Sequence, residues 1–363
     1  MAGDAPDPGT RQSLLELEPT DSKVAVRGLA ELVPDGGAWI PRRLPLAAVP
    51  LLAPSLETRA QMPASGRIQF VTDARRTEVD VAFEAAEGAQ TMPFDVVVDG
   101  EIASRTTIGE RGTLVVENPS RVRQNIDVWM PQFGFVRLGR LRFYDCTKVS
   151  APRDDAPRWT AYGSSITQCR TSAGPAETWP ALVARRQGWN LRGLGFGSEC
   201  HLDPIVGRFI RDTPAELISL CLGINIYGGA TFNERSLGAA IAGFIWAIRD
   251  GHPQTPIVVE SPIVSPSRES TPNAVGLTLA QVRSIVHETG EALIRMGDAG
   301  LHVIDGLEVI GWQDQTLLLD GLHPRDAGYR LMADRLGPRL SRVLSDSQLE
   351  HWQPTLAAAP TAQ

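Results

Sequence analysis

Short runs in which apolar and polar residues alternate fill the first part of the chain, from residue 23 to about residue 150. They occur at 68–71, 78–83, 94–98, 112–116, 125–129, 136–138 and 141–143. A period of two predicts half-buried β-strands. Asp99 and Gly100 between two runs are typical of a tight hairpin turn. The pattern predicts an antiparallel, jelly-roll-like β-sandwich without a helix of normal length.

From residue 158 the pattern changes to apolar strands that alternate with longer segments of helical periodicity. Strands are predicted at 159–162, 190–194, 217–222, 256–260 and 301–304. Helices are predicted at 179–187, 204–211, 234–249, 277–296 and from about residue 324 onward. Repeated strand–helix units predict an α/β domain with a parallel sheet covered on both faces. In such a domain, ligands bind beyond the carboxyl ends of the strands.

The two patterns indicate two domains, for which 363 residues are sufficient. We assign residues 23–150 to the β-sandwich and 158–348 to the α/β domain, joined by a polar, proline-containing linker at 151–157. Residues 1–22 and 349–363 are rich in small and polar residues, so we expect mobile tails there.

Charge and composition narrow the range of partners. A net charge of -7 and a pI near 5.5 argue against nucleic-acid binding and favour small-molecule ligands. The first 20 residues contain no basic segment followed by a long apolar stretch, so we expect neither a secretion signal nor a membrane anchor, and a cytoplasmic location. The oligomeric state has no signal in the sequence.

The four cysteines occur singly, which favours reduced thiols over a disulfide framework or a zinc site. Cys200 beside His201 is the one pair that suggests a metal. Adjacent side chains point in different directions, however, and no second pair has suitable spacing. We therefore expect no metal.

The residues with catalytic potential follow the predicted strands. Ser165 comes two residues after Gly163 at the end of the first strand, and His323 comes three residues after Asp320 and before the last helix. Because a carboxylate at this spacing can orient an imidazole that activates a serine, we predict Ser165 as nucleophile, His323 as general base and Asp320 as the orienting acid. A helix cap at Ser165 and a helix N-terminal acid at Asp320 remain alternatives.

Attack on a carbonyl creates an oxyanion, which needs hydrogen-bond donors. Asn225 follows the third strand of the α/β domain and offers its side-chain amide, although an asparagine there also suits a turn. The backbone N–H groups of Ser165 and Ser198 are the expected companions, with Gly197 as the alternative to Ser198. Three aromatic residues are candidates for substrate contact, with core packing as the alternative for each: Phe196, Tyr227 and Trp312.

Four blocks of the α/β domain resemble the SGNH (GDSL-type) hydrolase superfamily. They lie at 163–166, 195–198, 223–225 and 320–323, and the likeness extends from residue 158 to about residue 345. The resemblance implies a flavodoxin-like three-layer α/β/α fold and no metal. It also implies a catalytic triad and an oxyanion hole formed by Ser165, Asp320, His323, Asn225 and loop amides.

Three positions depart from the family pattern without removing a catalytic group. Ser164 replaces the usual aspartate before the nucleophile, Ile226 replaces an aspartate after the block-three asparagine, and Ser198 occupies what we interpret as the block-two glycine. A backbone N–H survives a change from glycine to serine, so the oxyanion donor is retained. The departures bear on substrate preference.

Three features together resemble a narrower group within the superfamily, the O-acyltransferases of polyketide (tetracycline-type) antibiotic biosynthesis. They are the β-sandwich ahead of the blocks, the variants Gly-Ser-Ser-Ile-Thr at 163–167 and Gly-Ile-Asn-Ile-Tyr at 223–227, and the expected lack of a secretion signal. This resemblance implies transfer of an aromatic, salicylyl-type acyl group from a coenzyme A thioester to a hydroxyl. It implies acyl-coenzyme A as co-substrate, with no bound cofactor, nucleic acid or membrane. Two alternatives remain open: an esterase or carbohydrate deacetylase with water as acceptor, and a non-catalytic binding module.

Overall fold

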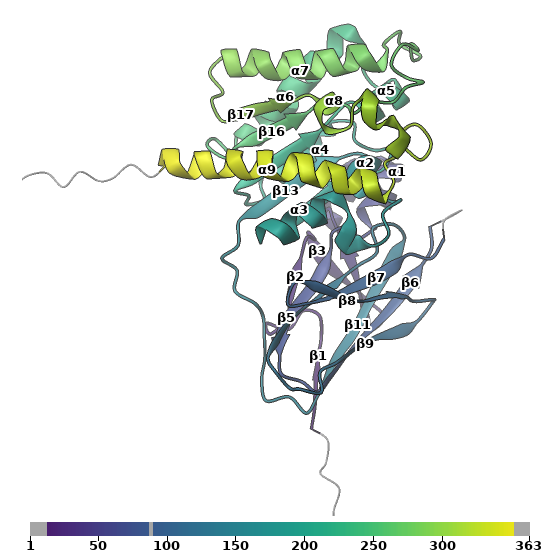
Figure 1. The fold of residues 1–363 in the computed structure, drawn as a ribbon, viewed down its shortest axis with the longest axis vertical. Helices are drawn as coiled ribbons and strands as arrows, with labels where there is room; N and C mark the ends of the chain where they lie inside the picture. Colours follow the sequence, from purple (N-terminus) through teal and green to yellow (C-terminus); the bar gives the residue numbers. More distant parts are fainter. Residues whose placement is uncertain (1–12, 87–89, 352–363) are drawn as a thin grey trace, which may run out of the picture. The chain divides into compact units, whose positions relative to one another are not determined.

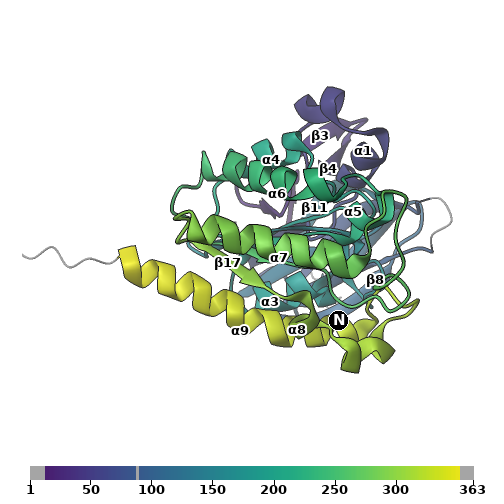
Figure 2. The same cartoon turned by 90° about the horizontal axis from the view of Figure 1, so that it is seen from above.

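The computed structural model describes residues 13–86 and 90–351, which divide into two compact units (Figures 1 and 2). Within these residues, unit 1 comprises the chain up to Pro45, Gln61–Asp154 and Gly174–Ala176. Unit 2 comprises Leu46–Ala60, Asp155–Ala173 and the chain from Glu177 onward. The expected continuous stretch 23–150 is therefore interrupted, because residues 46–60 belong with unit 2.

Unit 1 is a β-sandwich of two antiparallel sheets. The strands of the first sheet are β1 (Leu14–Leu17), β3 (Glu31–Asp35), β4 (Ala38–Arg42), β6 (Arg76–Glu84), β9 (Gly112–Glu117) and β11 (Phe135–Tyr144). The strands of the second sheet are β2 (Ala25–Arg27), β5 (Arg67–Thr72), β7 (Pro93–Val98), β8 (Glu101–Thr107), β10 (Gln124–Trp129) and β12 (Val149–Ser150).

The first sheet has the order β3-β4-β11-β6-β9 with β1 on β11, and the second has the order β12-β5-β10-β7-β8 with β2 on β5. Their apolar faces share one core, in which the Phe70 and Phe143 rings meet edge to face at 5.1 Å. The predicted sandwich is confirmed. The hairpin turn is also confirmed, since Asp99 and Gly100 join β7 to β8 with φ of 49° and 91°.

Several expectations for the N-terminal part are wrong. The runs 136–138 and 141–143 form one strand, β11, with an irregularity between Leu138 and Leu141. Strand β1 pairs with β11, although it lies in the stretch expected to be a mobile tail. Two short helical segments that were not predicted also occur here, the 3-10 helix η1 (Leu46–Leu51) and the helix α1 (Pro54–Ala60), neither of which has the length of a normal helix. Residues 1–12 and 352–363 of the expected tails lie outside the described residues.

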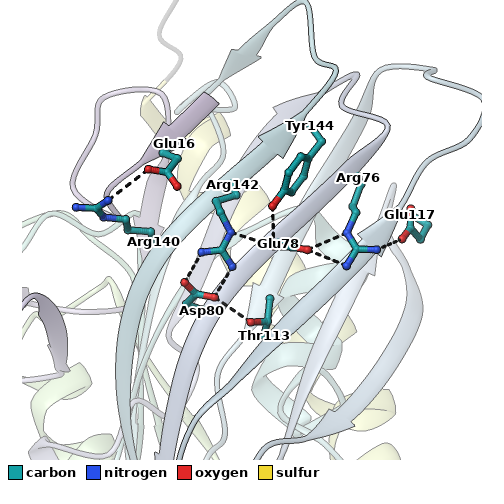
Figure 3. Close-up of polar contacts among 9 residues, drawn as sticks. All are labelled: Glu16, Arg76, Glu78, Asp80, Thr113, Glu117, Arg140, Arg142 and Tyr144. Atoms are coloured by element: carbon teal, nitrogen blue, oxygen red, sulfur yellow. Dashed lines mark hydrogen bonds and ion pairs between the residues drawn. The ribbon is translucent and has the colours of Figure 1, made fainter. Parts of the chain in front are cut away.

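The outer face of the first sheet carries a network of ion pairs (Figure 3). Arg142 on β11 donates to both oxygens of Asp80 at 2.6 and 2.7 Å and to Glu78 at 2.9 Å. Glu78 also accepts hydrogen bonds from Arg76 at 2.8 Å and from Tyr144 at 3.1 Å. This face follows from alternation along β6, where every second side chain is buried and the intervening polar ones point outward.

Unit 2 is an α/β domain. Its strands are β13 (Arg158–Gly163), β14 (Asn190–Gly195), β15 (Leu217–Cys221), β16 (Ile257–Glu260) and β17 (Leu301–Ile304). Its helical segments, besides η1 and α1, are α2 (Ser165–Gln168), η2 (Pro175–Glu177, whose first two residues belong to unit 1), α3 (Trp179–Gln187), α4 (Pro204–Arg211), α5 (Ile224–Gly229), α6 (Glu234–Arg249), α7 (Leu279–Arg295), α8 (Gly306–Val309), η3 (Trp312–Leu317) and α9 (Asp326–His351). Helix α9 passes the predicted start of the C-terminal tail at residue 349.

The five strands of unit 2 are parallel in the order β14-β13-β15-β16-β17, which confirms the flavodoxin-like topology. Helix α6 contacts both α4 and α7 in one layer, and α9 contacts both α3 and α8 in the layer on the opposite face (Figure 2). The chain order reverses between β13 and β15. Because ligands gather at such a reversal, the loops after these two strands are where a site is expected.

Candidate active site

Ser165 lies in a tight turn between β13 and α2. Gly163 ends the strand, and a Cβ at this position would collide with the Thr167 side chain, so the turn requires glycine. The helix is capped by Ser164, whose hydroxyl accepts the Ile166 N–H at 3.2 Å. Because Ser164 makes this cap, the structure decides against the alternative that Ser165 is the capping residue.

Ser165, His323 and Asp320 form a hydrogen-bonded chain. The Ser165 Oγ lies 2.9 Å from His323 Nε2, and His323 Nδ1 lies 2.7 Å from Asp320 Oδ2. The other carboxylate oxygen accepts the backbone N–H groups of Leu322 and His323 at 3.0 and 2.8 Å. In this geometry an acid orients an imidazole that can take the proton of a serine hydroxyl.

The electrostatics of Asp320 suit an orienting acid. Partial burial raises the pKa of its carboxyl, but hydrogen bonds from the His323 N–H, the His323 ring and the Leu322 N–H lower it more, to about 2. Asp320 is therefore a carboxylate at neutral pH. A negative charge beside Nδ1 favours a proton on that nitrogen, which leaves the Nε2 lone pair directed at Ser165.

Two side-chain hydrogen bonds hold the loop that carries Asp320 and His323. The Thr171 hydroxyl, in the loop after α2, donates to the Pro324 carbonyl at 2.8 Å. The Ser265 hydroxyl, in the loop after β16, donates to the Gly321 carbonyl at 2.7 Å. The loop is thus tied to the segment that follows the nucleophile, which fixes the approach of imidazole to serine.

The candidate oxyanion donors are oriented through their other polar atoms. Asn225 Oδ1 accepts the Cys200 N–H at 3.1 Å, and this bond fixes which end of the side-chain amide is the oxygen and which is the nitrogen. The Gly197 N–H is already bonded to Gln168 Oε1 at 2.7 Å. Of the two alternatives for the second backbone donor, this bond favours Ser198 over Gly197.

Three donors remain open at this edge of the sheet. Among the described residues, the Ser165 N–H, the Ser198 N–H and the Asn225 amide nitrogen donate no hydrogen bond. Block two approaches the nucleophile closely, since a Cβ placed on Gly197 would lie 3.5 Å from the Ser165 Cβ. Ser198 has φ of 66°, a strained value that aims its peptide unit. Such an arrangement can receive a developing oxyanion.

A family model for GDSL-like lipases and acylhydrolases matches residues 158–341, about half of the chain. The chain belongs to this family. The match contains all four sequence blocks and confirms the predicted superfamily. None of the curated proteins compared with the chain matches it.

Solved structures extend the likeness of this GDSL-family enzyme to both units. The salicylyl-acyltransferase SsfX3 from a tetracycline biosynthetic pathway is 29% identical with a TM-score of 0.84, over 92% of this chain and 98% of that one. A GDSL-like lipase from Bacteroides ovatus is 18% identical with a TM-score of 0.76, again over 92% and 98%. A family two carbohydrate esterase from Clostridium thermocellum is 16% identical with a TM-score of 0.63, over 78% and 93%. The last two share the fold.

Two of the three residues predicted to contact substrate are buried in the structure. Phe196 is wholly buried and meets Tyr162 edge to face, and Tyr227 is 8% exposed and donates its hydroxyl to the Thr271 carbonyl at 3.0 Å. Both therefore belong to the packing of the GDSL-family domain, since their rings face neighbouring side chains and loops. Trp312 is half exposed at the start of η3. It stays a candidate for substrate contact.

All four cysteines lie in the described part of the chain, and none forms a disulfide. Burial raises the pKa of the Cys169 thiol well above its ordinary value, so this cysteine is a poor substitute for Ser165 as nucleophile. The Cys200 thiol is buried, whereas the His201 ring lies 2.8 Å from the Ser198 carbonyl. Within residues 13–86 and 90–351, no cluster of three metal-ligating side chains occurs, and no helix is long and apolar enough to cross a membrane.

A buried acid lies at the carboxyl end of a strand of the parallel sheet. Glu260 ends β16 and accepts a hydrogen bond from the Cys221 thiol at 2.8 Å. Burial raises the pKa of its carboxyl to about 7, against smaller lowering by Cys221 and Arg339. Cys221 precedes the loop that carries Asn225. The sequence indicated a strand end here but gave no sign of a titratable acid in the core.

Sequence reasoning also missed residues that position the site. Gln168 orients Gly197, and the Arg59 Nε donates to the Gly197 carbonyl at 3.0 Å. Gln168 lies one helical turn after Ser165, a spacing that places both on one face of α2 and is the one available signal. Arg59 had no signal, because residues 46–60 were assigned to the sandwich.

Proposed function

We propose that this chain is a serine acyl-transfer enzyme that works through an acyl-Ser165 intermediate. The observation that carries the proposal is the hydrogen-bonded chain from Ser165 through His323 to Asp320, beside three open donors. Ser165 is the nucleophile, His323 the general base and Asp320 the acid that orients the ring. The Ser165 and Ser198 N–H groups and the Asn225 amide form the oxyanion hole.

In the first half-reaction, His323 Nε2 takes the proton of the Ser165 hydroxyl as Oγ attacks the acyl carbonyl carbon. The tetrahedral intermediate places its negative oxygen in the oxyanion hole. The bond from the acyl carbon to the leaving group then breaks, and the leaving thiolate or alkoxide takes the proton from His323. The acyl-serine remains, and the base is regenerated.

In the second half-reaction, an acceptor hydroxyl gives its proton to His323 and attacks the acyl carbon, and Ser165 leaves and recovers that proton. The acceptor decides between transfer and hydrolysis. An alcohol wins over water when the site holds it at high effective concentration and restricts water. No resident metal or cofactor is needed, because the imidazole and the amides supply base and electrophile.

We further propose that the donor is a coenzyme A thioester of an aromatic, salicylyl-type acid and that the acceptor is a hydroxyl of a polyketide of the tetracycline type. Support comes from the similarity to SsfX3, which extends over both units at 29% identity. Four cysteines outside disulfides suit a reducing compartment, and we place the reaction in the cytoplasm.

The second candidate is an esterase or carbohydrate deacetylase in which water accepts the acyl group. Its support is the fold shared with a family two carbohydrate esterase, at 16% identity. The same serine, histidine and aspartate would serve it, so the two functions differ at the acceptor. Identity this low relates the folds and says nothing about the substrate.

The decisive experiment supplies purified enzyme with salicylyl-coenzyme A, with and without a tetracycline-type polyketide alcohol, and measures conjugate and free acid by chromatography. If the enzyme is a transferase, conjugate should form only when the alcohol is present, and the alcohol should lower the amount of free salicylic acid. Free acid at a rate that the alcohol leaves unchanged would reject transfer and favour the hydrolase. Rapid quenching and mass spectrometry should find the acyl group on the peptide that contains Ser165, and Ser165→Ala is the matched control.

A further inference from the structure

Arg59 reaches the oxyanion loop from a segment remote in sequence. It lies on α1, in the stretch Leu46–Ala60 that belongs to unit 2. Leu56 and Ala60 on the same helix are buried, at 1% and 0% exposure. The half-buried Arg59 side chain then donates from Nε to the Gly197 carbonyl at 3.0 Å.

The peptide unit between Gly197 and Ser198 connects Arg59 to the proposed oxyanion hole. Its carbonyl accepts from Arg59, and its N–H is the Ser198 donor proposed for the oxyanion hole. The flanking groups are also held: the Gly197 N–H by Gln168 at 2.7 Å and the Ser198 carbonyl by the His201 ring at 2.8 Å. The Ser198 N–H is the one group of this set that donates no hydrogen bond to the described residues. It belongs to the same peptide unit as the Gly197 carbonyl that Arg59 binds, on the other side of the C–N bond.

We propose that Arg59 is a positioning residue of the oxyanion hole, which acts through the Gly197–Ser198 peptide by fixing its orientation and polarising its N–H. The proposal rests on the proposed acyl transfer at Ser165. A charge-assisted donor on an amide oxygen draws electron density from the nitrogen, so the N–H on the other side becomes a stronger donor. The guanidinium also adds positive charge near the developing oxyanion.

The Arg59 guanidinium is half-buried but keeps its positive charge. Burial lowers the pKa of Arg59 from its ordinary value, Glu199 raises it, and Arg170 lowers it again. A guanidinium keeps its charge at neutral pH under such shifts. The Arg59 charge therefore acts through a medium less polar than water, in which its effect on the amide is strengthened.

The test compares Arg59→Met, which removes donor and charge, with Arg59→Lys, which keeps the charge. Thr58→Ala, an exposed position on the same helix, is the matched control. Steady-state kinetics on an activated aryl ester give kcat and KM, and thermal unfolding checks the fold. Loss of one oxyanion donor costs about 10²- to 10³-fold, so weakening a donor should lower kcat by ~10-fold and change KM little.

A spectroscopic readout separates polarisation from mere support of the fold. The carbonyl stretch of a ¹³C-labelled acyl-Ser165 falls in frequency as the oxyanion donors strengthen. We expect Arg59→Met to raise this frequency, Arg59→Lys to lie close to the wild type in frequency and kcat, and Thr58→Ala to match the wild type. If Arg59→Met does not fold, Arg59→Gln, a neutral donor, replaces it, and the same difference from Arg59→Lys is expected.

The outcomes separate the two proposals. If wild-type enzyme acylates Ser165 but Arg59→Met keeps its kcat and carbonyl frequency, the role of Arg59 is overturned and acyl transfer stands. If Arg59→Lys falls as far as Arg59→Met, charge on this side chain is irrelevant, and the proposal is overturned as well. If the wild type forms no acyl-Ser165, the proposed function fails and the role of Arg59 fails with it.

Discussion

On the outer face of the β-sandwich, Arg142 donates three hydrogen bonds to Asp80 and Glu78, and both acids accept further bonds from neighbouring side chains (Figure 3). At the carboxyl edge of the parallel sheet, the bonds run differently. There Asn225 accepts a hydrogen bond through its side-chain oxygen, and Gly197 in the block-two loop donates one to Gln168. The Asn225 amide nitrogen and the Ser198 N–H donate no hydrogen bond in the described part of the chain.

The difference shows two uses of the same interactions. A network in which each charge meets its partner adds modestly to the stability of a surface. At the sheet edge, hydrogen bonds to neighbouring atoms fix the orientation of donors that are themselves unbonded. Such donors are already aligned for the negative charge that develops during the reaction, so little reorganisation is needed. Substitutions in the two regions should therefore affect different quantities: activity at the sheet edge and stability on the sandwich.

Replacing Ser165 by alanine should have the largest effect. Without the hydroxyl no acyl-enzyme forms, and turnover of an activated aryl ester should fall on the order of 10³- to 10⁶-fold. Circular dichroism and thermal unfolding should match the wild type, because the Ser164 cap of α2 is unchanged. Unaltered turnover would move the nucleophile to another residue.

Asp320→Asn should follow, with kcat lowered on the order of 10²- to 10³-fold. The amide oxygen can still accept the Leu322 and His323 N–H groups, but its NH₂ group opposes the Nδ1 proton and favours the wrong ring tautomer. The Asp320 side chain is 52% exposed, so water replaces part of what is lost. Steady-state kinetics on the same ester measure the effect, and a variant within a factor of about two of wild type would deny Asp320 this role.

The pKa of Asp320 adds a pH prediction. Its folded-state pKa of about 2 lies below the ordinary 3.8, so the stabilising bonds of the carboxylate are present above the ordinary value and are lost as pH falls through about 2. Any loss of kcat/KM above about pH 4 must then come from another group. In a pH–rate profile, an acid limb that Asp320→Glu displaces would contradict this assignment.

Glu260→Gln tests an acid that is buried without a cationic neighbour in hydrogen-bonding distance among the described residues. Its folded-state pKa of about 7 lies above the ordinary 4.5, so the wild type loses stability as pH rises from about 4.5 to about 7, where the buried carboxyl must ionise. The variant keeps an acceptor for the Cys221 thiol and does not ionise.

We therefore expect Glu260→Gln to match the wild type near pH 4 and to exceed its free energy of unfolding by on the order of 3 kcal/mol above pH 7. Urea unfolding at both pH values gives the difference. Glu78→Gln is the contrasting variant: burial raises the pKa of Glu78, but bonds from Arg76, Arg142 and Tyr144 lower it more. A Glu260→Gln difference that does not change with pH would mean that Glu260 is ionised throughout.

Periodicity in the sequence predicted most of this architecture. The helices at 179–187, 204–211 and 234–249 have the predicted bounds. Thr178 and Asn233 cap the first and third of them, and Pro204 begins the second, so each start has a local signal in the sequence. The four blocks predicted the nucleophile, base and acid that the structure brings together, because parallel strands end at one sheet edge.

What the sequence did not predict depends on contacts between distant segments. A hydrogen bond from Arg59 to a backbone carbonyl leaves no pattern, and neither does the insertion of residues 46–60 into unit 2. Phe196 is predicted to contact substrate because it is an aromatic residue in a loop, whereas in the structure it is buried and packs against Tyr162. The choice of Ser198 over Gly197 required the position of the Gln168 side chain.

Arg142→Met should have the smallest effect, and on stability alone. The variant leaves Asp80 and Glu78 without their shared cation, but both acids reach solvent and keep other donors, so screening limits the loss to about 1 to 2 kcal/mol of unfolding free energy. Turnover should stay at the wild-type level.

Glu117→Gln, which removes the negative charge of an exposed partner of Arg76 on the same face, is the matched control and should cost less. Because added salt screens the wild-type network, the difference between Arg142→Met and wild type should shrink at high ionic strength. A loss of turnover in Arg142→Met at unchanged stability would mean that this face takes part in substrate binding, and the division of labour between the two polar regions would fail.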